Sequence, residues 1–123
     1  SPLGRGMLAG WSKDWKADGF DFRAMMAPRF SGEALENNLR LVEQIAEIAR
    51  EQGATAGQVA LAWVLTRPGV VTIPGMTKLA NLKQNLGAAD VKLSPATIAR
   101  LDALAAKVKG ERYDESSMQS VNG

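Results

Sequence analysis

The chain has 123 residues, of which 46% are hydrophobic and 23% charged, and its formal net charge is +2 at pH 7; this composition is typical of a globular domain rather than of a disordered segment. It contains no cysteine and no histidine, which excludes from these residues a disulfide, a thiol nucleophile, a His-dependent catalytic triad and the commonest metal sites. No apolar run is long enough to cross a membrane and the basic residues are scattered, so we expect a cytoplasmic protein without a metal, a membrane or a nucleic acid as partner.

Residues 1–32 are expected to be irregular, because they hold five of the twelve glycines and show no helical or strand periodicity. A loop of this length is usually functional or disordered. Its aromatic residues argue against disorder and leave two alternatives open: a loop packed down by its own aromatic side chains, or a loop that covers a ligand. These aromatic residues are Trp11, Trp15, Phe20, Phe22 and Phe30.

Residues 33–67 predict two helices. In the first, apolar residues recur at spacings of three and four from Leu35 to Ala49, between Ser31 as N-cap and Gly53 as the residue after the helix. The second begins in TAGQVALAWVL (55–65), which opens with the T-x-x-Q spacing of a capping box and is apolar on nearly all sides. Such a helix is expected to be buried, with Trp63 in the core.

The run VVTI (70–73) predicts a short buried strand, because it is β-branched and lies between Pro-Gly punctuation on both sides. Two more helices are expected at 78–87 and 95–108, the second with Ser94 as N-cap and an inner face that extends to Val108. Residues 110–123 form a polar tail.

A single strand between helices is not a stable sheet, because both of its edges lack a partner. Helix–strand–helix order is what a repeating β/α fold looks like when it is cut out of a larger whole. We therefore expect an α/β fragment that is mostly helical, and a start in the middle of a motif at Ser1 favours a cut over a natural beginning.

Five stretches carry a resemblance to a known family, in the family's order and over nearly the whole chain. They are SPLGRGMLAG (1–10), PRFSGEALENN (28–38), TAGQVALAWVL (55–65), VVTIPGMTKLANLKQNLGA (70–88) and GERY (110–113). With these stretches the chain resembles the C-terminal part of an aldo-keto reductase of the branch with short tails. The resemblance implies a (β/α)8 TIM barrel, entered at the end of strand 7, with strand 8 at 70–73.

The resemblance also implies NADPH as cofactor and divides its binding between two segments. Residues 1–32 become the loop on the cofactor side, whose first part would lie along the pyrophosphate. The segment after strand 8 would hold the adenosine 2′-phosphate and the adenine. The implied residues are Ser1, Leu3, Gly4, Arg5 and Gly6 for the first segment, and Gly75, Met76, Thr77, Lys78, Asn81, Gln84 and Asn85 for the second.

The chemistry of the second segment agrees with that implication. A helix that begins near Lys78 offers unpaired N–H groups and a partial positive charge to an anion. A lysine beside the 2′-phosphate would favour NADPH over NADH through a charge-assisted contact of ~1.5–3 kcal/mol. From the spacing alone, an ordinary cap followed by a lysine in solvent is the favoured interpretation of Thr77 and Lys78, and the resemblance reverses that preference.

The family's catalytic Asp, Tyr, Lys and His have no matching positions here, and Tyr113 in the tail is not the catalytic tyrosine. The resemblance therefore implies part of a reductase of aldehydes or ketones that is inactive alone. Its partners would be the missing N-terminal part of the barrel and a small carbonyl substrate, and the fragment could self-associate. The alternatives are a non-catalytic nucleotide-binding remnant and a small helical interaction or DNA-binding module.

Overall fold

The computed structural model describes residues 1–10 and 20–121 of the chain. Over these residues the elements are helical, and no strand is present among them. In chain order they are the short 3₁₀ helix η1 (Gly4–Gly6), α1 (Phe22–Met26), η2 (Pro28–Phe30), α2 (Gly32–Glu51), α3 (Ala56–Leu65), α4 (Leu79–Gly87), η3 (Ala88–Asp90), α5 (Pro95–Ala105) and α6 (Glu115–Met118).

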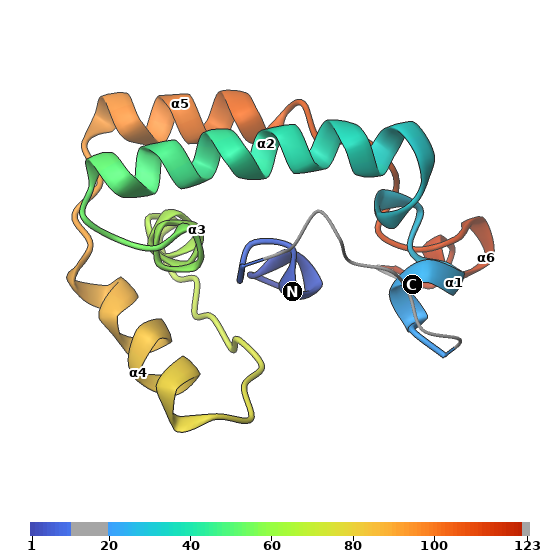
Figure 1. Ribbon diagram of the computed structural model, residues 1–123, viewed down its shortest axis with the longest axis horizontal. Coiled ribbons are helices and arrows are strands. Elements are labelled where there is room, and N and C mark those ends of the chain that lie inside the picture. The colour runs from blue at the N-terminus through green and yellow to red at the C-terminus, as the bar shows by residue number, and fades with distance from the viewer. Residues whose placement is uncertain (11–19, 122–123) are drawn as a thin grey trace.

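Helices α2 and α5 lie side by side and run in opposite directions (Figure 1). Helix α3 packs against α2 and is seen nearly along its axis in this view, with α4 next to it. The η1 turn lies between α4 on one side and α1, α6 and the tail on the other. The N-terminal turn is thus placed at the centre of the molecule, where elements far apart in the sequence meet.

The helical core forms where α2, α3 and α5 meet. Ile48 and Leu61 are almost fully buried, and Val59 has no exposed surface. Half-buried Trp63 packs against this cluster, so its predicted place is at the edge of the core rather than within it. The buried members of the helical core are Leu41, Ile48, Ala49, Val59, Leu101 and Leu104.

The predicted helix starts at Thr55 and Ser94 are confirmed by hydrogen bonds. Thr55 Oγ1 accepts from the backbone N–H of Gln58 at 3.2 Å, and the Gln58 side chain accepts from the Thr55 N–H at 3.0 Å, which completes a capping box. Ser94 Oγ accepts from the Thr97 N–H at 3.1 Å, with Pro95 as the first helical residue. The sequence could predict both helix starts, because each capping residue and its partner lie within four residues of one another.

Two helix ends differ from the sequence-based expectation. Ser31 is the N-cap residue of α2 but makes no side-chain capping bond. Helix α5 ends at Ala105, three residues before the predicted end, and Val108 is 41% exposed rather than part of an inner face. A helix shortens by a turn when its last apolar residue finds nothing to pack against.

The predicted strand at 70–73 is wrong for this structure. Residues 70–76 have no regular secondary structure, and Val71 and Ile73 are 84% and 88% exposed. A β-branched run becomes a strand only when a neighbouring strand accepts and donates its ladder hydrogen bonds. The described residues contain no other strand to do so.

The apolar face of α4 is also uncovered. Leu79, Leu82 and Leu86 follow the spacing of three and four that predicts a buried stripe, yet they are 67%, 39% and 65% exposed. The apolar periodicity thus predicted the helix correctly, but no described element packs against the apolar face of α4.

The aromatic residues of the first 32 positions do not pack as one group. Phe30 is buried with Met7 and Ala27, whereas Phe20 is 97% exposed. Trp11 and Trp15 lie outside the described residues. Among the described aromatic residues of this loop, Phe30 is the one that is buried, as the alternative of a packed loop predicts.

Candidate functional site

The η1 turn has an unusual backbone. Gly4, Arg5 and Gly6 have φ values of +57°, +55° and +94°, and Arg5 is the only non-glycine with positive φ among the described residues. An L-residue in this region costs about 1–2 kcal/mol, so surrounding contacts must hold it there. One is the Ser1 hydroxyl, which accepts from the Arg5 N–H at 2.9 Å.

The backbone N–H groups of η1 are bonded within the turn itself. Gly4 donates to the Ser1 carbonyl at 3.0 Å and Gly6 to the Leu3 carbonyl at 3.1 Å. The residues expected to lie along a pyrophosphate are therefore together in one turn, with their main-chain donors already in use. What this turn offers to an anion in this conformation is the Arg5 side chain.

The Arg5 guanidinium is fixed from two sides. Its carbon lies 4.4 Å from the centroid of the Tyr113 ring and 4.9 Å from that of Phe22, and Nη1 donates to the Arg112 carbonyl at 3.2 Å. Cation–π contacts of this kind order an arginine without neutralising it. Tyr113 and Arg112 of the tail, together with Phe22 of α1, thus fix the orientation of the Arg5 side chain.

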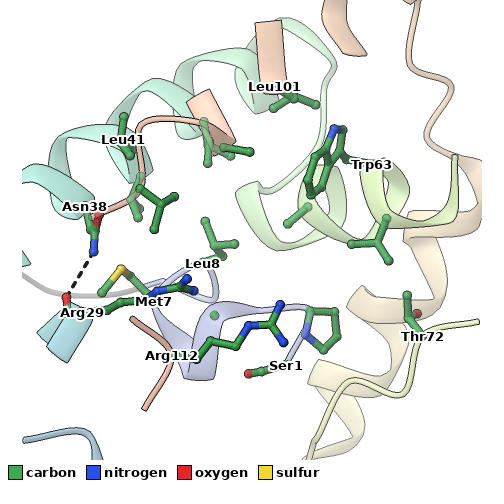
Figure 2. Close-up of a pocket in the computed structure, with 18 of the residues that line it drawn as sticks. Ser1, Met7, Leu8, Arg29, Asn38, Leu41, Trp63, Thr72, Leu101 and Arg112 are labelled. Carbon is green, nitrogen blue, oxygen red and sulfur yellow. Dashed lines mark hydrogen bonds between the residues drawn. The ribbon is translucent and has the colours of Figure 1, made fainter. Parts of the chain in front are cut away.

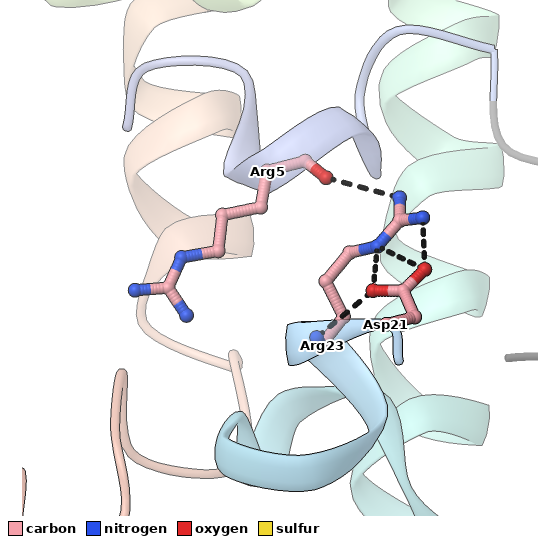
Figure 3. Close-up of polar contacts among 3 residues, drawn as sticks. All are labelled: Arg5, Asp21 and Arg23. Carbon is pink, nitrogen blue, oxygen red and sulfur yellow. Dashed lines mark hydrogen bonds and ion pairs between the residues drawn. The ribbon is translucent and has the colours of Figure 1, made fainter. Parts of the chain in front are cut away.

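The backbone of Arg5 is held from the opposite side by α1 (Figure 3). Arg23 donates from Nη1 to the Arg5 carbonyl at 3.4 Å and forms an ion pair with Asp21, which also caps α1. The Arg23 hydrogen bond is the largest cause of the lowered pKa of the Asp21 carboxyl. The pair therefore stays charged at neutral pH and ties α1 to the turn.

Gly57 in α3 is the point where the turn and α4 meet. A Cβ atom at this position would lie 3.4 Å from the Leu8 carbonyl oxygen, 3.5 Å from the Leu3 side chain and 3.7 Å from Nε2 of Gln84. The absence of a side chain at Gly57 allows both predicted segments to approach α3 closely. The fold thus brings the two halves of the predicted site to one wall.

The start of α4 presents an exposed, uncapped helix N-terminus. Lys78 is the N-cap residue, with extended φ and ψ of −118° and 139°, and no side chain caps the helix. Because Lys78 and not Thr77 is the N-cap residue and no side chain caps the helix, Thr77 is not the ordinary cap that the spacing allowed. Lys78 is exposed to solvent, as that alternative expected. First-turn N–H groups without a side-chain acceptor, next to a lysine, suit an anion.

The other implied residues of α4 do not share one environment. Asn81 is exposed, whereas Asn85 donates to the Met76 sulfur at 3.8 Å. Gln84 is turned toward α3, where its amide donates to Thr55 Oγ1 at 3.0 Å and its backbone carbonyl accepts from the Gln58 amide at 3.0 Å. Gln84 therefore anchors α4 to α3 in this structure, and Gly75 is exposed in the irregular segment before the helix.

A buried asparagine holds the tail against the start of α2. Asn38 is 3% exposed; its amide donates to the Lys109 carbonyl at 2.9 Å and its oxygen accepts from the Lys109 N–H at 3.0 Å. Arg29 Nε donates to the Gly110 carbonyl at 2.9 Å beside it. These bonds fix residues 109–113, and hence Tyr113, next to the turn.

A second polar network joins α3 to α5. Trp63 Nε1 donates to Asp102 Oδ1 at 2.8 Å, and Arg67, which lies 5.2 Å from the Trp63 ring centroid, donates to the same oxygen at 2.5 Å. The Trp63 hydrogen bond, followed by that of Arg67, lowers the pKa of Asp102. Because Val59 and Leu61 are buried against neighbouring elements, α3 cannot serve as an exposed recognition helix.

A cavity of about 500 Å³ opens between α2, α3, the turn and residues 71–73 (Figure 2). Its upper wall is apolar and includes Leu41, Trp63 and Leu101, while Arg29 and Arg112 lie at its lower edge. This cavity borders the exposed 70–76 segment.

Sequence reasoning missed the polar residues that hold the site together, which are Asp21, Arg23, Arg29, Asn38 and Arg112. Three of them, Arg29, Asn38 and Arg112, belong to the quoted stretches PRFSGEALENN and GERY, although sequence reasoning assigned no role to any of them. Within the described ranges no group of three or more acidic side chains could hold a metal ion. None of the helices in those ranges is both long and apolar enough to span a membrane.

Comparison with known proteins gives two findings. The family model described as "Aldo/keto reductase family" matches residues 1–106. The aldo-keto reductase str7 of Strobilurus tenacellus is 40% identical over 118 residues, which cover 91% of this chain and 34% of the relative. The chain thus spans about a third of the length of that curated relative.

Proposed function

The chain belongs to the aldo/keto reductase family, and from that premise we propose that it supplies the adenosine and pyrophosphate side of the cofactor site of an NADPH-dependent reductase of aldehydes and ketones. In this proposal the remaining strands of a (β/α)8 barrel and the catalytic residues come from chain outside these 123 residues. The relative's greater length supports that division.

The observation that carries the proposal is the start of α4. Lys78 is exposed, makes no ion pair in the described part of the chain and stands at a helix N-terminus without a side-chain cap. A phosphate monoester suits such a position, because the helix dipole and the ammonium act on it together. In this class of barrel, phosphate groups commonly bind at the loops after strands 7 and 8.

The residues of the chain would divide the cofactor among them. Lys78 and Thr77 would hold the 2′-phosphate, Asn81 and Asn85 would flank the adenine, and Arg5 would face the pyrophosphate. Gln84 would position α4 against the Thr55 capping box rather than contact the base, since its amide is already bonded. When bound, NADPH supplies the hydride that reduces the carbonyl carbon.

The decisive experiment compares two adenosine ligands that differ only in the 2′-phosphate. We expect adenosine 2′,5′-bisphosphate to bind the chain more tightly than adenosine 5′-monophosphate, as measured by titration calorimetry. Lys78→Ala should weaken bisphosphate binding roughly tenfold, the loss of one charge-assisted contact, and should leave monophosphate binding unchanged.

The matched control is Lys83→Ala on the same helix, which removes the same charge away from the helix start. If Lys83→Ala weakens bisphosphate binding as much as Lys78→Ala, the effect is net charge and the assignment of Lys78 fails. We also expect no NADPH oxidation when the chain alone is mixed with an aldehyde. Turnover by the purified chain would refute the proposal that catalytic residues come from elsewhere.

A further inference from the structure

The side chain of Gln58 connects the beginning of α3 with the end of α4, which lies next to it (Figure 1). Its Oε1 accepts from the Thr55 N–H at 3.0 Å, and its Nε2 donates to the Gln84 carbonyl at 3.0 Å. The first partner is the N-cap N–H of α3, and the second is one of the last four carbonyls of α4, a group that a helix leaves unpaired. One amide thus satisfies backbone groups at two helix ends.

This double role requires a glutamine at position 58. A capping box accepts either Glu or Gln at the third helical position, because each offers an acceptor to the N-cap N–H. An ionised glutamate has no donor for a carbonyl, whereas a glutamine amide has both an acceptor and donors. The residue type of Gln58 is therefore specified by its contact with α4 and not by the cap of α3 alone.

Gly87, the last residue of α4, lies beside the same amide. Its φ and ψ of −60° and −18° are ordinary helical values, so the backbone conformation does not require a glycine. A Cβ atom at this position would lie 2.7 Å from Gln58 Nε2, which is too close for a real contact. Gly87 thus leaves the space that the Gln58 amide occupies, although glycine disfavours a helix.

Helix α4 is attached to α3 by polar contacts rather than by a buried face. Every residue of α4 belongs to the described part of the chain and none is buried. Besides the bond from Gln58, the Gln84 amide donates to Thr55 Oγ1 at 3.0 Å. We call Thr55, Gln58, Gln84 and Gly87 the docking cluster, because these four residues join α4 to the first turn of α3.

The docking cluster stands between the two proposed parts of the cofactor site. Gly57, next to Gln58, is the residue at which Leu3 and Leu8, on either side of η1, approach α3. The first turn of α3 therefore contacts the η1 turn through Gly57 and α4 through Gln58. A single ligand that reaches both the turn and the start of α4 requires α4 in its docked position.

We propose that Gln58 and Gly87 are positioning residues: their contact docks α4 on α3 and thereby sets where the start of α4 stands relative to the η1 turn. Neither residue touches the cofactor. The consequence for binding rests on the proposed function: a docked α4 is preorganised for adenosine 2′,5′-bisphosphate, and an undocked α4 binds it more weakly.

Gly87→Ala is the first test, because it changes no charge and removes no polar group. The added methyl either displaces the Gln58 amide from the Gln84 carbonyl or moves α4 away, and both results break the contact. We expect the bisphosphate to bind the 123-residue chain about three- to tenfold more weakly in titration calorimetry, the loss of one hydrogen bond. Unchanged affinity would overturn the proposal.

The stability of the same variant separates positioning from a loss of structure. Alanine is a better helix former than glycine, so we expect Gly87→Ala to keep the helical content and the urea midpoint of the wild type while its affinity falls. A parallel loss of helical content would assign the weaker binding to unfolding of α4 and would contradict a positioning role.

A double variant identifies Gln58 as the partner of the added methyl. Gln58→Ala should weaken bisphosphate binding by about the same factor as Gly87→Ala. Adding Gly87→Ala to Gln58→Ala should cause no further loss, because the amide is already absent. Two losses that add in full would mean that Gly87→Ala acts elsewhere, and the contact would be refuted.

Gln58→Glu tests the amide while the capping box of α3 stays intact. The carboxylate has no donor for the Gln84 carbonyl but gains one when it is protonated. We therefore expect weakened bisphosphate binding at pH 7 and, relative to wild type at the same pH, recovery as the pH falls toward about 4. Gln44→Glu makes the same charge change at an exposed position of α2 and should bind as wild type does. If it weakens binding equally, the effect is net charge and the proposal fails.

Backbone N–H signals in NMR spectra separate this inference from the proposed function. If the wild type does not bind the bisphosphate, the proposed function fails and the docking is judged without a ligand. Gly87→Ala should then shift the N–H signals of residues 79–81, at the opposite end of α4. Signals that stay in place would show that α4 has not moved and that the positioning role is wrong.

Discussion

The helical core and the 70–86 stretch contain residues of the same kind in opposite environments. In the helical core, Ile48 is 2% exposed and Val59 fully buried. In the 70–86 stretch, Ile73 is 88% and Val71 84% exposed, and the apolar side chains of α4 follow them on the surface. The sequence predicts that both regions are buried, but in the structure only the helical core is buried.

The difference shows what an apolar pattern specifies. A helix satisfies its backbone hydrogen bonds internally, so α2, α3 and α5 form and then bury their apolar faces against one another. A strand needs hydrogen-bond partners from elsewhere in the chain. The run at 70–73 has none among the described residues, and the apolar surface beside it stays open.

The largest expected effect comes from the core. Ile48→Ala removes a side chain that is 2% exposed, and we expect the free energy of unfolding to fall by about 2–5 kcal/mol. Urea unfolding followed by circular dichroism measures it. A loss no greater than that of an exposed residue would mean that the helical core does not hold the fold.

The next effect concerns the bond between the tail and α2. Asn38→Ala leaves the N–H and carbonyl of Lys109 without their partner, at a cost of about 1–3 kcal/mol. Asn37→Ala is the control, since the half-buried Asn37 bonds one backbone group of the chain after α5, the Lys107 carbonyl. We expect Asn38→Ala alone to make the tail sensitive to brief proteolysis. Equal resistance of the two variants to proteolysis would contradict the role of Asn38 in holding the tail against α2.

A smaller effect is expected at low pH, where the N-cap of α6 loses its charge. Hydrogen bonds from Ser116 and then Ser117 lower the pKa of Asp114 from 3.8 to about 2, so its capping of α6 is fully present above pH 4 and is lost as the pH falls toward 2. NMR titration of the Asp114 carboxyl should give this midpoint. Ser116→Ala should raise it toward the ordinary value, and an unchanged midpoint would exclude the hydroxyl as the main cause.

The smallest effect is expected in the 70–86 stretch. Because Ile73 is 88% exposed, Ile73→Ala should change the free energy of unfolding by less than about 0.5 kcal/mol. The same urea experiment compares it directly with Ile48→Ala. A loss of more than about 2 kcal/mol would show that residue 73 is buried in solution, for example by a second copy of the chain.

Sequence reasoning found the starts of α3 and α5 because a cap and its partner lie within one helical turn. It also placed Lys78 at the start of α4, where the structure has it. It did not find the contacts of Arg5 with Tyr113 or of Asn38 with Lys109, because these residues are far apart in the sequence. No local pattern carries such a pairing.

The sequence by itself determined the family, the positions of the main helices and their caps, since these depend on motifs and on hydrogen bonds between near neighbours. Only the tertiary structure decided that Gln84 anchors α4, that Arg5, Arg29 and Arg112 share one pocket, and that residues 70–76 stay unpaired. The physical reason is the same in each case. A side chain's role at a distance depends on which surfaces the packed helices bring together, and a strand depends on neighbours that the chain must supply.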